Sequence, residues 1–252
     1  MRKTGTIYLV GAGPGPVDLL TLRAARLIEG ASVIVHDGLI GPDILHLARP
    51  DARLISVAKQ RARHTMPQDE INALLVHEAL AGHDVVRLKG GDPFIFGRGG
   101  EEAETARAAG VPVEVVPGIS AANGAAAASQ IALTHRDASS IVSFVAGQCK
   151  GLSEQDWSGL AGKGRTLVIY MGVSTAAAIA EKLMADGLAP SMPVAVIENA
   201  ARPEMRVLRG LLAGLPQLVE AGAVKSPALI VIGEVTARED AAVAALVQES
   251  AQ

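Results

Sequence analysis

The feature of this sequence that most limits its fold is the regular alternation, in the first half, of short apolar runs with helical segments. Apolar runs lie at 7–10, 32–36, 54–57, 84–88 and 113–116. Segments at 19–29, 68–81 and 100–109 carry the spacing or end signals of helices. Strands joined through crossover helices pair in parallel. The first half is therefore expected to form an α/β domain with a parallel sheet.

The second half predicts a different sheet. Pro117 and Gly118 interrupt the pattern, and an alanine-rich helix at 121–129 restarts it. Strands are expected at 141–146, 166–170, 194–197, 206–209 and 228–232, with helices near 174–185 and 211–220. The strands at 194–197 and 206–209 are too close in sequence for a crossover helix, so they should be antiparallel. We expect two α/β domains, 1–117 and 118–252, the second with a mixed sheet.

Composition excludes several classes of protein. The chain has 252 residues, of which 49% are hydrophobic and 19% charged, so a sizeable core is expected. A net charge of −3 and only 2% aromatic residues argue against nucleic acid as a partner. The single cysteine, Cys149, excludes a multi-cysteine metal site, and the histidines lack metal-ligand spacing, so no metal is predicted.

Neither a membrane segment nor a signal peptide is indicated. No stretch reaches the roughly 18 apolar residues that a transmembrane helix needs. The apolar run after "MRKTG" is shorter than the core of a signal peptide, and it is better interpreted as the first strand. We expect no membrane partner and a cytoplasmic location.

The first glycine loop, "VGAGPGPVD", imitates a dinucleotide-binding turn. Gly11 and Gly13 match the Gly-x-Gly-x-x-Gly pattern, and Asp37 stands where an acidic ribose ligand would follow. The third glycine is replaced by Pro16, however, and Pro14 and Pro16 have no N–H to offer a pyrophosphate. A stiff turn is expected in place of an anion site, with an NAD-dependent dehydrogenase as the alternative.

A second glycine-rich segment, "RLKGGDPFIFGRGGEEAE", follows the strand "DVVRL" directly. Ligand sites in open α/β sheets gather at the carboxyl ends of strands. Gly90 and Gly91 allow a ligand close to the backbone. Asp92 could accept a hydrogen bond from an ammonium or ribose hydroxyl, and Arg98 could bind a carboxylate. A surface loop with a capped helix behind it is the alternative.

Both glycine-rich segments resemble motifs of the tetrapyrrole methylases. Five further motifs follow the order found in that family: "VIVHDGLI", "VPGISAA", "LTHRD", "YMGV" and "SPALIVIG". The resemblance covers residues 5–236. The most similar branch acts on uroporphyrinogen III, and the chain length predicts its stand-alone form. The resemblance implies a class III methyltransferase fold, a homodimer, and S-adenosylmethionine bound in a cleft between two α/β domains. The cofactor-binding residues that it implies are Pro14, Gly90, Gly91, Asp92, Ile95, Ser120, Ala121, Met171 and Ala200.

The reaction that the resemblance implies is methylation of uroporphyrinogen III at carbons 2 and 7. Its products are precorrin-2 and S-adenosylhomocysteine. Asp37 is implied as proton acceptor and Lys59 as proton donor. Arg98 is a competing candidate, but its high intrinsic pKa favours a role as substrate clamp. Precorrin-2 serves sirohaem, haem d1 and cobalamin synthesis, and the sequence does not choose among them.

The substrate carries eight carboxylates, so a basic lining is expected despite the net negative charge. Arg98 and Arg136 are predicted to bind the substrate, and the basic segment 58–64 adds further positive charge. Glu101 is predicted to orient Arg98 or to contact a pyrrole N–H. Arginine can bind a carboxylate through two bonds, which gives orientation as well as attraction.

Three departures from the family pattern leave alternatives open. Ala58 and Gln60 flank Lys59 where Gly and Arg are common, Gln148 stands in place of histidine, and Ala132 in place of proline. They are compatible with a sibling methylase that acts on a later precorrin intermediate. A binding module that keeps the fold without turnover is a further alternative.

Overall fold

The computed structural model describes residues 3–58, 66–148 and 156–238. The chain divides into two compact units, Met1–Ala121 and Ala122–Gln252. The expected boundary, at Pro117, lies shortly before this division. Each unit contains one five-stranded sheet, so the two are described in turn.

The sheet of the first unit is entirely parallel, in the order β3-β2-β4-β1-β5. Its strands are β1 (Ile7–Gly11), β2 (Val33–His36), β3 (Arg53–Ser56), β4 (Val85–Lys89) and β5 (Val113–Val116). The central strands β4 and β1 are buried along almost their whole length because helices cover both faces of the sheet. The parallel sheet expected for the first half is confirmed.

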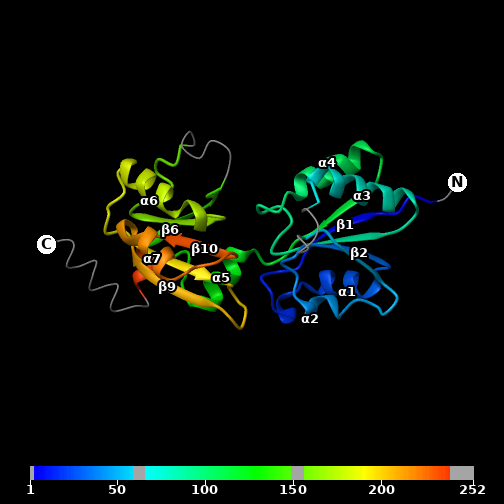
Figure 1. Ribbon diagram of the computed structural model, residues 1–252, viewed down its shortest axis with the longest axis horizontal. Helices are drawn as coiled ribbons and strands as arrows, with labels where there is room; N and C mark the ends of the chain where they lie inside the picture. The colour runs from blue at the N-terminus through cyan, green and yellow to red at the C-terminus, as the bar shows by residue number, and fades with distance from the viewer. Residues whose placement is uncertain (1–2, 59–65, 149–155, 239–252) are drawn as a thin grey trace. The chain divides into compact units, whose positions relative to one another are not determined.

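Two hydrophobic clusters lie on opposite faces of this sheet. On one face, odd-numbered strand residues such as Leu9, Val35 and Val85 pack against α3 (Gln68–Leu80) and α4 (Gly99–Ala108). On the other, even-numbered residues pack against α1 (Leu22–Gly30) and α2 (Pro42–Leu45). Figure 1 shows the two pairs of helices on either side of the sheet. The period of two along each strand thus decides which helix pair a side chain meets.

The second unit has a mixed sheet in the order β6-β7-β10-β8-β9. Its strands are β6 (Ser139–Ala146), β7 (Gly164–Tyr170), β8 (Pro193–Glu198), β9 (Arg206–Leu211) and β10 (Ala228–Ile232). Only β6 and β7 pair in parallel, whereas β7–β10, β10–β8 and β8–β9 are antiparallel. The predicted antiparallel pairing of 194–197 with 206–209 is confirmed.

One face of the second sheet is covered by α6 (Ala176–Ala185) and α7 (Leu215–Ala221), whose apolar residues join those of the strands in a single cluster. Trp157, the only tryptophan of the chain, is buried in that cluster. The alanine-rich helix α5 (Ala121–Ser129) lies on the side of the sheet away from α6 (Figure 1).

Two helices begin later than the sequence pattern predicted. The first was expected from 19, but α1 starts at Leu22, where Thr21 accepts a hydrogen bond from the Ala24 N–H. Residues 17–19 form a 3-10 turn, because Pro16 holds the preceding chain extended. The helix expected from 211 starts at Leu215, because β9 continues to Leu211 and a 3-10 turn follows. The short helix α2 was not predicted.

Candidate functional site

The carboxyl ends of the parallel strands gather the predicted motifs of the first unit at one edge of its sheet. The glycine loop after β1, Asp37 after β2, the Gly-Gly-Asp segment after β4 and the Pro-Gly turn after β5 all emerge there. Since all the strands point the same way, these segments are neighbours in space although they are distant in sequence. The edge is therefore the candidate site.

The two glycine loops are hydrogen-bonded to each other. The Gly13 N–H donates to the Gly91 carbonyl at 3.1 Å, and the Gly91 N–H donates to the Gly13 carbonyl at 2.7 Å. Both residues have φ of 69°, a left-handed conformation that suits glycine. The Gly13 N–H, which a dinucleotide fold would aim at a pyrophosphate, is thus used within the protein. This geometry disfavours the dehydrogenase alternative.

A third turn packs against this pair through its main chain. A Cβ added to Gly118 would lie 2.3 Å from the Gly91 carbonyl oxygen and 2.8 Å from the Gly11 Cα. A Cβ added to Gly11 would lie 2.5 Å from the Gly118 nitrogen. All three distances are far below van der Waals contact. Glycine is therefore required where the turns after β1, β4 and β5 meet.

Asp92 ties these turns together. One carboxylate oxygen accepts from the Phe94 N–H at 2.8 Å, and the other accepts from the Gly118 N–H at 3.0 Å. The side chain is partly buried. Asp92 thus joins the segment after β4 to the turn after β5, a bracing role that the sequence did not reveal. Each oxygen keeps a second lone pair with which it could accept a bond from a ligand.

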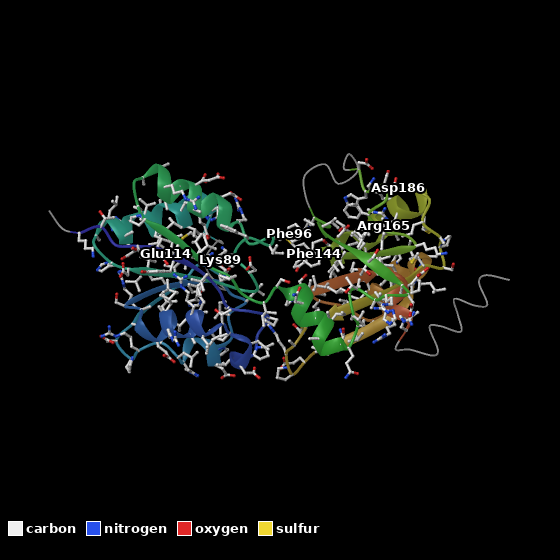
Figure 2. The ribbon with its side chains drawn as sticks, turned by 180° about the vertical axis from the view of Figure 1, so that it is seen from behind. Lys89, Phe96, Glu114, Phe144, Arg165 and Asp186 are labelled. Carbon is white, nitrogen blue, oxygen red and sulfur yellow. The ribbon has the colours of Figure 1, made fainter. Side chains whose placement is uncertain are left out.

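The loop from Pro93 to Arg98 leads from this edge into α4. Phe94, Ile95 and Phe96 are exposed at its tip; Figure 2 labels Phe96 there, and Lys89 inside the unit. Arg98 has φ of 58° and forms two hydrogen bonds with the Glu101 carboxylate, at 2.8 and 2.7 Å. The predicted pairing of Glu101 with Arg98 is thus observed.

The Arg98–Glu101 pair lies beside a shallow pocket of about 500 Å³. The pocket is lined by Pro93, Phe94, Arg98, Gly99, Gly100, Glu101 and Glu104. The hydrogen bonds to Glu101 raise the pKa of Arg98, and those to Arg98 lower the pKa of Glu101. Both side chains are exposed, so the pair contributes little to stability. Its place beside the pocket is consistent with ligand binding.

A buried cluster of charged side chains lies under the same edge. Arg87 and Lys89, on β4, and Glu102, on α4, are each only 2% exposed. One oxygen of Glu102 accepts from Arg87 Nε and from Lys89 Nζ, both at 3.0 Å. Arg87 also donates to Asp37 Oδ1 at 2.5 Å. Burial, and then the charge of Arg87, lower the pKa of Lys89. Sequence reasoning missed this cluster.

The second unit carries two of the predicted cofactor residues at strand ends. Met171 directly follows β7, is exposed, and has a left-handed φ of 56°. Ala200 follows β8 and lies between Asn199 and Ala201, whose φ values are 49° and 59°. Non-glycine residues in this conformation are strained, and such strain concentrates at functional sites. These backbone angles mark both positions independently of the family pattern.

The remaining predicted residues occupy varied environments. Pro14 and Ser120 are buried, Gly90 and Ala121 are partly buried, and Ile95 and Arg136 are exposed. Arg136 lies in the turn that precedes β6, in the second unit. Lys59 lies outside the described residues, as do the basic residues that follow it, so its role as proton donor stays a prediction.

The described part of the chain contains neither a group of metal ligands nor a membrane-spanning helix. Within 3–58, 66–148 and 156–238, no three His, Cys, Asp or Glu side chains are grouped so that they could hold a metal ion. Among the helices in those same ranges, none combines the length and the apolar character needed to cross a membrane.

The chain is similar to several proteins of known type. Residues 6–216 match the sequence model of the Tetrapyrrole (Corrin/Porphyrin) Methylases. The siroheme synthase of Gluconacetobacter diazotrophicus is 52% identical over 233 residues, which are 92% of this chain and 50% of that protein. That of Tolumonas auensis is 53% identical over 237 residues, 94% of this chain and 50% of that protein. The chain thus spans about half the length of these curated relatives.

Solved structures show the same architecture. The uroporphyrin-III C-methyl transferase of Thermus thermophilus, complexed with S-adenyl homocysteine, has a TM-score of 0.77 and 39% identity, with 92% of this chain and 93% of that one covered. A cobalt precorrin-4 methyltransferase has a TM-score of 0.81 at 24% identity, with 92% and 95% covered. The second similarity concerns the fold alone. Together they confirm the predicted fold class.

Proposed function

This chain belongs to the tetrapyrrole methylases, and on that premise we propose that it transfers two methyl groups from S-adenosylmethionine to uroporphyrinogen III. The methylated positions are carbons 2 and 7, and the products are precorrin-2 and two molecules of S-adenosylhomocysteine. Its product then enters sirohaem synthesis, to which the relatives' names refer.

The observation that carries the proposal is the mutual pairing of Gly13 and Gly91 at the carboxyl edge of the first sheet. A dinucleotide enzyme would offer the N–H groups of its first loop to a pyrophosphate. Here the Ala12 N–H donates to the Lys89 carbonyl and the Gly13 N–H to the Gly91 carbonyl, so this main-chain surface does not offer these two groups to a phosphate. Such a surface suits a ligand without phosphates that is bound mainly by shape and by a few polar groups.

The side chains near this edge fit S-adenosylmethionine, which combines an apolar adenosyl part with a charged amino-acid part. Ile95 offers an exposed apolar surface at this edge. Asp92 supplies carboxylate oxygens with spare lone pairs for an ammonium or a ribose hydroxyl. No group of metal ligands occurs in the described residues, and the proposed reaction needs none.

The proposed contacts divide the cofactor among the strand-end turns. Gly90, Gly91 and Asp92 contact the amino-acid and ribose parts, with Ile95 against them. Ser120 and Ala121 add main-chain and hydroxyl contacts, and Pro14 borders the cofactor. The adenine contacts the main chain at Met171 and Ala200. Met171, Asn199 and Ala201 have left-handed φ angles, so the backbone at these positions has a shape that a regular strand end would not offer.

The chemistry requires little more than alignment and a proton acceptor. A pyrrole carbon of the electron-rich macrocycle forms a bond to the methyl carbon, and the methyl–sulfur bond breaks with its electron pair remaining on sulfur. The macrocycle then loses a proton, which the Asp37 carboxylate accepts. Holding carbon, methyl and sulfur in line and excluding water supplies much of the rate acceleration.

The anionic macrocycle is held through its carboxylates. Arg98, beside the shallow pocket and oriented by Glu101 through two hydrogen bonds, is proposed as the principal clamp. Arg136, exposed in the second unit, is proposed to bind another carboxylate. Charge-assisted pairs of this kind fix orientation as well as affinity.

A two-substrate assay tests the proposal. The protein is incubated anaerobically with uroporphyrinogen III and S-adenosylmethionine, and the tetrapyrrole product is analysed by mass spectrometry. Two added methyl groups per macrocycle are expected. An unmodified macrocycle would contradict the proposal, and methylation of a later precorrin in its place would identify a sibling methylase.

A further inference from the structure

The buried charged cluster of Arg87, Lys89 and Glu102 leads along one face of the sheet to Asp37 at the candidate site. Register pairs Val35 of β2 with Arg87 of β4, so the residue two positions after Val35, Asp37, lies just beyond the end of β2 on the same face as Arg87. Val85, Arg87 and Lys89 follow one another on that face toward the carboxyl edge. The apolar cluster under α3 and α4 therefore ends in charged groups where the site begins.

Every nitrogen of the Arg87 guanidinium has a partner. Nε donates to Glu102 at 3.0 Å, and Nη2 donates to Asp37 at 2.5 Å. Nη1 lies 3.4 Å from the Leu88 carbonyl and 3.5 Å from the Val35 carbonyl. A planar group held at three corners can neither rotate nor shift freely. The bond to Asp37 therefore has a fixed direction.

Glu102 is the anchor of this arrangement. Its Oε1 accepts from Arg87, from Lys89 and, at 3.2 Å, from Gln68 of α3. Lys89 thus supplies a second positive charge that balances Glu102 and Asp37 together with Arg87. The burial changes sharply along the cluster: the Arg87 side chain is 2% exposed, whereas that of Asp37 is 30% exposed. The cluster is closed at Glu102 and reaches solvent at Asp37.

We propose that Arg87, anchored on Glu102, is a positioning residue that holds the Asp37 carboxylate in the orientation in which it accepts the proton from the macrocycle. The inference rests on the proposed function, in which Asp37 is the proton acceptor. Arg87 touches neither substrate nor cofactor and acts only through Asp37. Misplacement of a reacting group by about 1 Å can cost roughly 100-fold in rate.

A double-mutant cycle tests this role. Arg87→Met is expected to lower kcat between about 10- and 100-fold, while KM for uroporphyrinogen III and the Kd of S-adenosylhomocysteine stay unchanged. In an Asp37→Ala background, Arg87→Met should cause no further loss, because the group through which it acts is already absent. A purely structural residue would add its own loss in both backgrounds and would weaken cofactor binding.

Loss of Arg87 leaves the buried negative charge of Glu102 with Lys89 as its remaining positive partner. The double variant Arg87→Met/Glu102→Gln, which removes one charge of each sign, is therefore measured in parallel. The matched control is Arg53→Met, which breaks the ion pair between the edge strand β3 and the buried Glu78 and should keep wild-type kcat. Wild-type kcat in Arg87→Met, or additive losses in the cycle, would overturn the inference. If Asp37→Ala itself retained full activity, the proposed role of Asp37 would fail first, and the two failures are thus distinguishable.

Discussion

The two units bury their charged side chains in different ways. In the first, Arg87, Lys89 and Glu102 form a cluster that ends at the partly exposed Asp37, at the edge where the strand-end turns meet. In the second, the buried Glu198 accepts two hydrogen bonds from Arg206 and one from the Lys225 N–H. That group braces β8, β9 and the segment before β10.

The difference follows from sheet topology. A parallel sheet brings all its carboxyl ends to one edge, so polar side chains on several strands converge there. In the mixed sheet, β9 and β10 run opposite to β6, β7 and β8, so fewer strand carboxyl ends meet at one edge. The first unit can therefore supply side chains for chemistry, whereas the second offers strained main chain at Met171, Asn199 and Ala201. The following predictions test that division, in order of their expected effect on stability.

The contact between the turns of the first unit should be the most sensitive feature. Gly118→Ala places a methyl group 2.3 Å from the Gly91 carbonyl oxygen, so we expect a loss of about 3 kcal/mol or more in the free energy of unfolding. Urea denaturation measures it. Gly100→Ala, whose added Cβ meets nothing within 4 Å, is the control and should be neutral or slightly stabilising. Equal stability of the two variants would show that the turns do not depend on this close approach.

Removing the carboxylate that braces these turns should have the next largest effect. Asp92→Ala leaves two main-chain N–H groups without their acceptor, and we expect a loss of about 1–2 kcal/mol in stability. The affinity for S-adenosylhomocysteine should fall as well, which calorimetry measures. Asp92→Asn keeps one oxygen acceptor, so its stability and its affinity for S-adenosylhomocysteine should lie between those of the wild type and of Asp92→Ala. An unchanged dissociation constant in Asp92→Ala would remove this residue from the site.

The brace of the second unit should affect stability without affecting catalysis. Arg206→Ala removes a half-exposed guanidinium from the buried Glu198, and we expect a loss of about 1 kcal/mol in the free energy of unfolding. Steady-state kinetics at a temperature well below the transition should give wild-type kcat and KM. A selective loss of kcat in this variant would break the proposed division between the units.

The exposed Arg98–Glu101 pair should show the opposite behaviour. Arg98→Ala removes a surface ion pair, so the free energy of unfolding should not change measurably. Without a guanidinium to bind a substrate carboxylate, KM for uroporphyrinogen III should rise roughly tenfold. Kinetics at varied tetrapyrrole concentration provide the measurement, with Arg49→Ala, another exposed arginine paired with a nearby carboxylate, as control. Identical KM values in both variants would count against the clamp.

Much of the architecture followed from local pattern. The alternation of strands and helices predicted the parallel sheet, and the short segment between 197 and 206 predicted the antiparallel pair, because each depends on chain length and period alone. The late start of α1 could not be predicted from the local sequence pattern. The chain at Pro16 is extended and a 3-10 turn follows it, and the start of the helix at Leu22 depends on the Thr21 cap.

The buried cluster could not be predicted in the same way. Arg87 and Lys89 end a strand whose sequence, "VVRLK", is also compatible with exposed charges at a strand end. Their burial depends on the register that places Arg87 beside Val35 and on the helix that brings Glu102 over them. These are tertiary contacts between residues far apart in sequence. The pairing of Gly13 with Gly91 was hidden for the same reason.

The central claim is that the paired glycine turns of the first unit hold the methyl donor. A crystal structure of the protein with S-adenosylhomocysteine tests it most directly. The account predicts the ligand against Gly90, Gly91 and Asp92, bordered by Pro14, with the Gly13–Gly91 hydrogen bonds intact. A ligand bound elsewhere on the chain, or one that separates the two turns in order to bond their N–H groups, would contradict it.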